Sequence, residues 1–136
     1  MIKFSKETDY ALQLLEHLSH SKDVLSLSEF SANSNISLPI LQKIARSLKK
    51  HKLILAYRGK NGGYTLARLI GEISLKDVVE AMQVEYGMTD CTKKQHSCKL
   101  ESNCNAKKGF KVLHSQVEAI MQSTTLDIFF HKEQHV

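Results

Sequence analysis

Apolar residues spaced three or four positions apart predict three helices in the N-terminal part of the chain. The first covers Lys6–His20, with an apolar stripe of Tyr10, Ala11, Leu14, Leu15 and Leu18. The second opens at Ser26-Leu27-Ser28-Glu29, which has the spacing of a capping box, and continues through about Asn33. A turn follows, and Ser37 is the expected N-cap of a third helix that reaches about His51.

The third helix has two chemically different sides. Its apolar side comprises Leu41, Ile44, Ala45 and Leu48. Its opposite side comprises Gln42, Lys43, Arg46, Lys49 and Lys50. Because the apolar side is expected to pack against the first two helices, the basic side is presented to solvent or to a ligand.

The hydrophobic period changes after the third helix. Two short apolar runs, Leu53–Tyr57 and Tyr64–Ala67, flank the segment Arg58-Gly59-Lys60-Asn61-Gly62-Gly63. Because Asn-Gly and the additional glycines permit positive φ angles, we interpret this part as a β-hairpin. A helix pair, a basic third helix and a glycine-rich hairpin follow one another in the order of a winged helix-turn-helix. The predicted fold is therefore mainly α with a small β-hairpin.

Two further helices are predicted in the C-terminal half. Ser74 is the expected N-cap of a helix over about Leu75–Gln83, and the last helix covers roughly Asn105–Ser123. On the last helix, Phe110, Leu113, Val117 and Ile120 follow a coiled-coil-like 3-4-3 spacing, and we call these residues the C-terminal seam. Such a seam can pack on its own domain or on a second copy. DNA readers of this size usually bind two half-sites as dimers, so we favour the second copy. The predicted units are a winged helix-turn-helix DNA-binding domain at 1–84, a cysteine segment at 85–104, a dimerisation helix at 105–125 and a tail at 126–136.

Charge is distributed unevenly along the chain, whose formal net charge is +5. No Asp or Glu occurs from Phe30 to Gly71. The same stretch carries Lys43, Arg46, Lys49, Lys50, Lys52, Arg58, Lys60 and Arg68. A basic block without acids is typical of a protein that binds a polyanion, so double-stranded DNA is the expected partner.

The position of each cation predicts which part of DNA it contacts. Residues near the start of a recognition helix usually reach base edges in the major groove, and later ones reach phosphates. Arginines on a hairpin suit the negative potential of the neighbouring minor groove. We therefore assign Gln42, Lys43 and Arg46 to bases, Lys49 and Lys50 to phosphates, and Arg58 and Lys60 to the minor groove.

The chain has three cysteines, Cys91, Cys98 and Cys104, spaced as C-x6-C-x5-C. An odd number of cysteines in a reducing compartment argues against a structural disulfide framework. Three thiolates on one short polar segment suit a soft metal or an iron–sulfur cluster, although the CxxC pair of common zinc sites is absent. The residues alone leave three interpretations open: a cluster, zinc, or reactive thiols.

Other protein classes are disfavoured. Charged residues occur throughout Lys3–Asp9, which argues against a signal region, and no apolar run of about 18 residues occurs, so we expect a cytoplasmic protein without a membrane span. An enzyme with Cys91 or Cys98 as nucleophile is disfavoured because no oriented Cys–His–carboxylate set can be assigned. The segment Gly59–Gly63 precedes a strand rather than a helix, unlike a phosphate-binding loop.

Several segments together match the pattern of a known family. They are Tyr10-Ala11-Leu12, the helix from Ile36 to Leu48, the stretch from Arg58 to Arg68 (RGKNGGYTLAR), Asp90-Cys91 and Thr124-Thr125-Leu126. The chain resembles, over nearly its whole length, the bacterial iron–sulfur transcription regulators that include IscR, NsrR and RirA. The glycine-rich stretch combined with three cysteines is specific, whereas the helix patterns alone are not.

The resemblance implies a function. It implies a homodimer that is joined through the last helix. The leading hypothesis is a repressor, and the basic block together with the C-terminal seam predicts binding to a roughly palindromic operator. The resemblance also implies that Cys91, Cys98 and Cys104 hold an iron–sulfur cluster, whose state alters DNA affinity in response to nitric oxide, redox stress or iron supply. A winged-helix regulator that uses zinc or direct thiol oxidation is the alternative.

Three cysteines leave one iron of a 4Fe–4S cluster, which we favour over a 2Fe–2S cluster, without a thiolate. Where IscR-like relatives have a histidine three residues after the third cysteine, this chain has Lys107. In NsrR-like relatives an aspartate in the motif T-D-x-A-L ligates the cluster of the opposite subunit. The carry-over onto Thr8-Asp9-Tyr10-Ala11-Leu12 falls on Asp9. Asp90 and His96 are the other candidates, and we favour Asp9 over His96.

Overall fold

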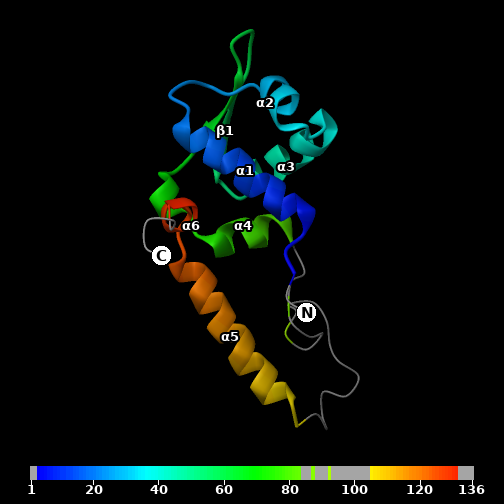
Figure 1. Cartoon of the computed structure of the whole chain (residues 1–136), viewed down its shortest axis with the longest axis vertical. Coiled ribbons are helices and arrows are strands. Elements are labelled where there is room, and N and C mark those ends of the chain that lie inside the picture. Colours follow the sequence, from blue (N-terminus) through cyan, green and yellow to red (C-terminus); the bar gives the residue numbers. More distant parts are fainter. Residues whose placement is uncertain (1–2, 84–86, 88–91, 93–104, 132–136) are drawn as a thin grey trace.

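The computed structural model of the chain describes residues 3–83, 87, 92 and 105–131. Within these residues the fold is helical with one two-stranded antiparallel sheet, as the sequence predicts. The elements are α1 (Lys6–His20), α2 (Leu27–Ser34), α3 (Leu38–Lys50), β1 (Ile54–Tyr57), β2 (Gly63–Leu66), the 3-10 helix η1 (Ile70–Glu72), α4 (Leu75–Met82), α5 (Lys107–Ser123) and α6 (Leu126–His131). The hairpin projects from one end of the molecule and α5 from the other (Figure 1).

The core lies where α1, α3 and α4 meet. Leu14 and Leu15 of α1, Leu41 of α3 and Val78 of α4 are completely or almost completely buried. Their burial follows the helical period, so each helix turns one apolar side inward. Helix α1 begins after Ser5, whose side chain accepts a hydrogen bond from the Thr8 amide at 3.2 Å. The core formed by α1–α4 together with the hairpin holds the apolar side of α3 in place.

Helix α2 begins as predicted, but its predicted capping box is wrong. Ser26 is the N-cap residue and its side chain accepts no cap hydrogen bond. The helix is held instead by burial of Leu27 and Phe30 and by the bond from the Phe30 amide to the Ser26 carbonyl at 3.2 Å. It continues through Ser34, one residue beyond the predicted end, before the chain turns.

The predicted hairpin is confirmed, with Tyr57 paired to Gly63 and Ile54 paired to Leu66. Positive φ angles occur at Gly59 (111°) and Gly63 (156°). A Cβ atom on Gly63 would lie 2.2 Å from the carbonyl oxygen of Leu25, so no larger residue fits there without a backbone shift. This close approach lets the segment before α2 pair with the hairpin.

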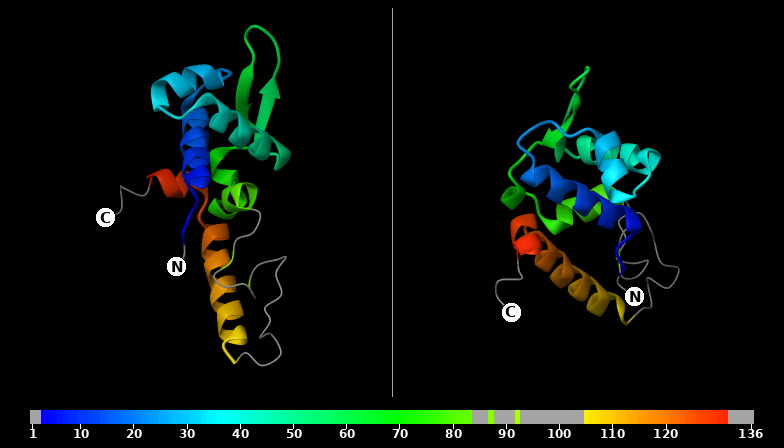
Figure 2. Two further views of the ribbon diagram at one scale, coloured as in Figure 1. Left: turned by 90° about the vertical axis from the view of Figure 1, so that its right-hand side faces the viewer. Right: turned by 45° about the horizontal axis from the view of Figure 1, so that its top comes forward.

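The C-terminal part departs from the prediction. Helix α5 ends at Ser123, as expected for the long C-terminal helix, and Figure 2 shows it starting far from helices α1–α4 and ending beside them. Just beyond its end, the Leu126 amide donates to the Ile73 carbonyl at 2.8 Å. Residues 126–131, expected as part of a tail, form α6 because Leu126 is completely buried and fixes the start of the helix. Within the described residues, no helix is both long and apolar enough to cross a lipid bilayer.

Candidate DNA-binding face and the first turn of α1

Helix α3 is positioned for recognition by a tight connection from α2. Asn35 ends α2 in the left-handed conformation, with φ of 60°. The Ser31 hydroxyl then donates to the Ile36 carbonyl at 2.6 Å, and the Ile36 amide donates to the Ser34 hydroxyl at 3.3 Å. These two bonds satisfy backbone groups at the turn and fix the angle between the helices. The two helices and this turn form the helix-turn-helix.

The predicted division of α3 into an apolar and a basic side is confirmed. The predicted apolar residues are all buried: Leu41, Ile44, Ala45 and Leu48. The residues on the opposite side are all exposed: Gln42, Lys43, Arg46, Lys49 and Lys50. The structure therefore brings together five of the residues assigned to DNA on one open helical surface, which we call the recognition face.

One member of the recognition face has an acidic partner that the sequence did not predict. The Lys43 ammonium lies 2.8 Å from the carboxylate of Glu7, in the first turn of α1. Glu7 precedes the acid-free stretch, so the pairing places a negative charge beside a surface whose own segment contains only cations. No local pattern signals a contact between residues 36 positions apart.

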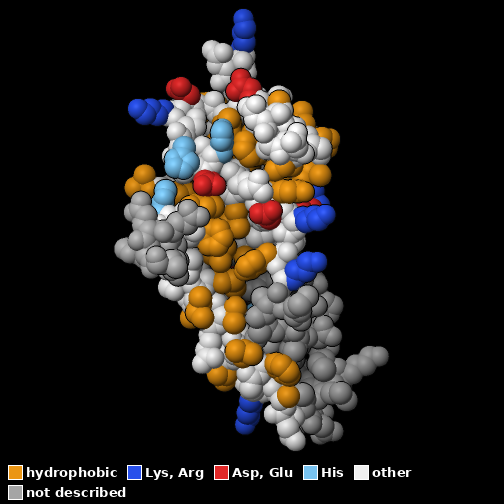
Figure 3. Space-filling model, viewed as in Figure 1, with side chains coloured by type: hydrophobic (Ala, Val, Ile, Leu, Met, Phe, Trp, Pro, Cys, Tyr) orange, Lys and Arg blue, Asp and Glu red, His pale blue; other side chains and the backbone are white. Residues whose placement is uncertain are grey.

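The hairpin begins directly beside the end of α3. Lys52 adopts a left-handed conformation, with φ of 60°, and the Leu53 amide donates to the Leu48 carbonyl at 3.0 Å. Arg58 and Lys60 are exposed on the loop between the strands. Figure 3 shows a basic side chain at the tip of the hairpin. These two cations therefore stand apart from the recognition face, on an arm that starts next to its last turn.

The hairpin is fixed to the body of the fold from two sides. Leu25 and Tyr64 form a bridge, in which each amide donates to the other's carbonyl at 2.9 Å. Arg68, just beyond the hairpin, lies 3.7 Å from the carboxylate of Asp77 on α4. Arg68 thus contributes to the base of the hairpin rather than to its tip, although it belongs to the basic block.

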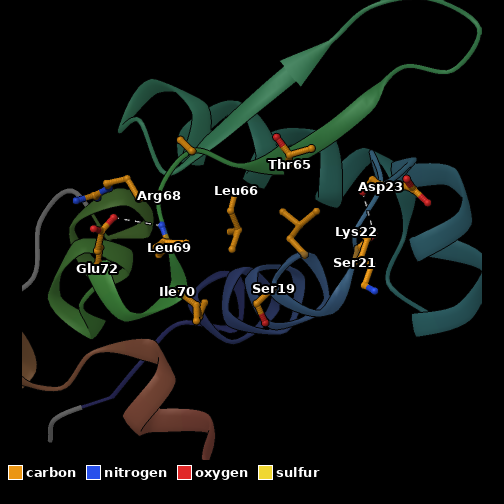
Figure 4. Close-up of a pocket in the computed structure, with 12 residues that line it drawn as sticks. Ser19, Ser21, Lys22, Asp23, Thr65, Leu66, Arg68, Leu69, Ile70 and Glu72 are labelled. Atoms are coloured by element: carbon orange, nitrogen blue, oxygen red, sulfur yellow. Dashed lines mark hydrogen bonds between the residues drawn. The ribbon is translucent and has the colours of Figure 1, made fainter.

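A pocket of about 560 Å³ lies between the end of α1 and the chain leaving the hairpin. Its lining combines an apolar centre with charged residues at both ends (Figure 4). Leu66 and Ile70 lie near the centre, Lys22 and Asp23 at one end, and Arg68 and Glu72 at the other. None of the described residues that we assign to DNA or metal lines it.

The first turn of α1 is tied to the last described turn before the cysteine segment. The Thr8 hydroxyl donates to the side-chain oxygen of Gln83 at 3.0 Å, and the Ser5 amide points to the same oxygen at 3.3 Å. Thr8 is completely buried. Gln83 immediately precedes residues 84–86, so this bond network lies at the entrance to the cysteine segment.

Asp9 follows Thr8 and is exposed, and its carboxylate accepts a hydrogen bond from the side-chain amide of Gln13 at 3.3 Å. The other candidate ligands, Cys91, Cys98, Cys104, Asp90 and His96, lie outside the described residues. Among the residues that are described, no three His, Cys, Asp or Glu side chains are grouped to hold a metal ion. Asp9 is therefore the one predicted ligand with a described position, and it lies beside the network around Gln83.

Glu7 and Gln83 are the residues of interest that the sequence did not single out. Each acts across a long sequence separation, 36 residues for Glu7–Lys43 and 75 for Thr8–Gln83. Neither contact has a local sequence signal, but both converge on the first turn of α1, the turn that carries the Thr8-Asp9 motif.

Comparison with known proteins agrees with this geometry. The chain matches the Rrf2 family, described as "Iron-dependent Transcriptional regulator", over residues 4–132. It is 30% identical over 140 residues to the HTH-type transcriptional regulator NsrR of Halalkalibacterium halodurans, covering 98% of this chain and 94% of that protein.

Two solved structures show the same fold. One is CymR (YrzC), the global cysteine regulator of B. subtilis, with a TM-score of 0.75, 21% identity and coverage of 95% of this chain and 96% of that one. The other is IscR of T. potens, with a TM-score of 0.70, 22% identity and coverage of 99% and 92%. The family and the relative are transcriptional regulators, which confirms a DNA-binding regulator rather than an enzyme. The chain belongs to the Rrf2 family of transcriptional regulators.

Proposed function

We propose that this chain is a dimeric repressor whose affinity for a palindromic operator is controlled by an iron–sulfur cluster. Cys91, Cys98 and Cys104 would hold the cluster, and Asp9 would supply the fourth ligand. The observation that carries the proposal is the bond network from Gln83 to Ser5 and Thr8, because it ties the start of the cysteine segment to the turn that bears Asp9. That turn also contacts the recognition face through Glu7.

The donor set fits a 4Fe–4S cluster. Three cysteine thiolates are the soft, charged ligands that such clusters require, and one iron remains for another donor. The exposed Asp9 carboxylate has one described hydrogen-bond partner, the side-chain amide of Gln13, and retains lone pairs for a metal. When bound, the cluster would supply an iron open to nitric oxide or oxidants, since a carboxylate is a weaker ligand to iron than a thiolate. The family description as iron-dependent supports the choice of metal.

DNA binding would use the recognition face and the hairpin. Gln42, Lys43 and Arg46 would reach base edges, and Lys49 and Lys50 would reach phosphates. Arg58 and Lys60 would enter the neighbouring minor groove. All seven side chains are exposed, and the five on α3 share one surface, as this assignment requires.

A second copy would pack on α5. Its apolar residues remain open to solvent in the single chain, most of all Ile120 and Val112, which are 64% and 58% exposed. Phe110 and Leu113 of the C-terminal seam are also exposed, whereas Val117 of the seam and the buried Met121 pack against the core. Figure 3 shows hydrophobic side chains continuing along this helix. An apolar surface of this kind is typical of an interface between subunits.

Anaerobic reconstitution tests the cluster. We expect wild-type protein to take up iron and sulfide and to turn brown, and the triple Cys→Ala variant to take up neither. The Asp9→Ala variant should bind a less stable cluster with an altered response to nitric oxide. The matched control is Gln13→Ala, which keeps the carboxylate and removes its hydrogen-bond donor.

Three results would contradict the proposal. Colourless wild-type protein that contains zinc would support the zinc regulator instead, and protein without metal whose DNA affinity follows thiol oxidation would support a thiol switch. An altered spectrum in His96→Ala but not in Asp9→Ala would assign the fourth ligand to His96.

The subunit that supplies Asp9 can be identified with mixed dimers. One chain carries Asp9→Ala, and the other carries the three Cys→Ala changes. The resemblance to NsrR-like proteins implies that Asp9 of the partner subunit completes the site, and such a dimer would then retain one complete site. If Asp9 instead binds the cluster of its own chain, the mixed dimer would have no complete site. Its spectrum would then match that of the Asp9→Ala dimer.

A further inference from the structure

The recognition face carries one built-in ion pair. Lys43 Nζ lies 2.8 Å from a carboxylate oxygen of Glu7, and the side chains remain 64% and 39% exposed, respectively. Both partners are therefore accessible to DNA that docks on α3. We propose that Glu7 is a specificity-determining residue: it competes with DNA phosphates for Lys43 and so directs this lysine to base edges. The inference rests on the proposed role of α3 in DNA binding.

The backbone that carries Glu7 is anchored by its neighbours. Its neighbour Thr8 is completely buried and bonded through its hydroxyl to Ser5 (2.9 Å) and Gln83 (3.0 Å). Ser5 caps the same turn, so the backbone that carries Glu7 is fixed relative to α4. An exposed ion pair is usually weak because two flexible side chains must be ordered. Here the backbone of one partner is already ordered, which favours the pair.

The chemistry of the ammonium group explains why Glu7 would favour contacts of Lys43 with bases over contacts with phosphates. Lys43 has three N–H donors, and Glu7 occupies one or more of them without preventing the others from reaching a base. A guanine acceptor is neutral, so a lysine paired with Glu7 still hydrogen-bonds to it. A phosphate attracts chiefly the net charge of lysine, which Glu7 cancels, and the carboxylate itself repels the phosphate.

The two classes of DNA complex should therefore respond differently to Glu7. Binding to arbitrary sequences depends almost entirely on phosphate neutralisation. Binding to the operator also uses base contacts from Gln42 and Arg46, for which we expect little effect of Glu7. Glu7 thus lowers affinity for arbitrary DNA more than affinity for the operator, and it raises the ratio between the two.

The test is Glu7→Gln, measured by fluorescence anisotropy on an operator duplex obtained by random-site selection and on a scrambled duplex. We expect affinity for the scrambled duplex to rise about three- to tenfold, and the magnitude of the slope of log K against log salt to increase by roughly 0.9, the value for one added phosphate contact. Operator affinity should change less than twofold. Lys43→Met should abolish the effect of Glu7→Gln in a double-mutant cycle.

Glu16→Gln is the matched control, because Glu16 lies on the same helix and carries the same charge. It should leave both affinities unchanged. An equal rise on both duplexes for Glu7→Gln would make Glu7 a general repulsive charge, and no change on either would remove it from DNA binding; each overturns the proposal. Wild-type protein that binds neither duplex would instead refute the proposed function. Thermal unfolding of each variant confirms that the fold is intact.

Discussion

Helices α3 and α5 are both amphipathic, yet they present opposite sides to solvent. In α3 the apolar residues are buried in the core and the exposed side is basic. In α5 only Met121 is buried, and most apolar residues of the helix face outward. Within the described residues, the apolar side of α3 is therefore covered by the fold, whereas most of the apolar side of α5 is exposed.

This difference indicates which surface serves which partner. A basic exposed side with a buried apolar side suits a polyanion, because the helix is held from behind and its charges remain free to bind. An exposed apolar side suits a second protein surface. Substitutions on the two helices should therefore have separable effects on folding, dimerisation and DNA binding.

Truncating the buried side of α3 should have the largest effect. Leu41 is completely buried, so Leu41→Ala should lower the free energy of unfolding by about 2–5 kcal/mol. The loss should be similar at every protein concentration, as measured by urea unfolding. Leu113→Ala on α5 provides the comparison: its effect should depend on protein concentration, because it acts through the dimer. Equal, concentration-independent losses would contradict the distinction between the helices.

Placing a charge on the C-terminal seam should separate the subunits. Ile120→Glu buries a carboxylate in the proposed interface, so the dimer dissociation constant should rise about 100-fold or more, which corresponds to about 2.7 kcal/mol. Sedimentation velocity measures this change, and circular dichroism should show an intact fold. Ser115→Glu, an exposed position on the opposite side of α5, is the control and should remain dimeric. A dimeric Ile120→Glu variant would place the interface elsewhere.

Two substitutions on the recognition face should separate base contacts from phosphate contacts. Arg46→Ala should weaken operator binding by about 1–3 kcal/mol and relax preference at one base pair. Lys49→Ala should weaken all duplexes alike and reduce the salt slope by about 1. Titrations at several salt concentrations distinguish these outcomes. Identical behaviour of the two variants on operator and scrambled DNA would remove base reading from Arg46.

The smallest expected effect concerns the start of α6. The Thr125 hydroxyl donates to the Asp127 carboxylate, and this bond, followed by the Ile128 amide, holds the pKa of Asp127 below its ordinary value. Thr125→Val should raise this pKa toward its ordinary value, as followed by carboxyl-carbon NMR. Thr124→Val is the control, since Thr124 bonds to the Ile120 carbonyl and should leave Asp127 unchanged.

The sign of the pH dependence follows from the lowered pKa. A carboxyl group with a lower pKa in the folded state stabilises the fold above its unfolded pKa, and the contribution disappears as pH falls through the folded pKa. Thr125→Val should therefore destabilise the protein more at neutral pH than in strong acid. A loss that is the same at both pH values would show that the hydroxyl acts through packing alone.

The sequence predicted the elements whose signals are local. Helix α1 has the predicted bounds, the burial of Leu41 and Leu48 follows the predicted stripe, and Ser74 forms the predicted cap of α4 with Asp77. Helical spacing and capping act over a few residues, so a single sequence carries them. The hairpin was similarly predictable, because two short apolar runs flank a glycine-rich segment in which Gly59 and Gly63 adopt positive φ angles.

The sequence did not predict features that depend on distant partners. Helix α6 was missed because its start is fixed by Leu126 pairing with Ile73, far away in the chain. The pair of Lys43 with Glu7 was missed for the same reason, although each residue looks ordinary in its own helix. The capping box at Ser26 was predicted wrongly, because tertiary burial of Leu27 already fixes that turn. The sequence pattern thus predicts which residues form the recognition face. The acidic partner of Lys43 on that face, Glu7, is visible only in the tertiary structure.

Random-site selection tests the central claim most directly, namely that the basic side of α3 reads duplex DNA in a dimer. Wild-type protein and Arg46→Ala are each used to select from a pool of random duplexes. Wild-type protein should enrich a palindromic site with half-sites about one helical turn, or a multiple of it, apart. Arg46→Ala should lose preference at one symmetric pair of positions. Wild-type protein that enriches no sequence, or a variant that enriches the identical site with equal strength, would contradict it.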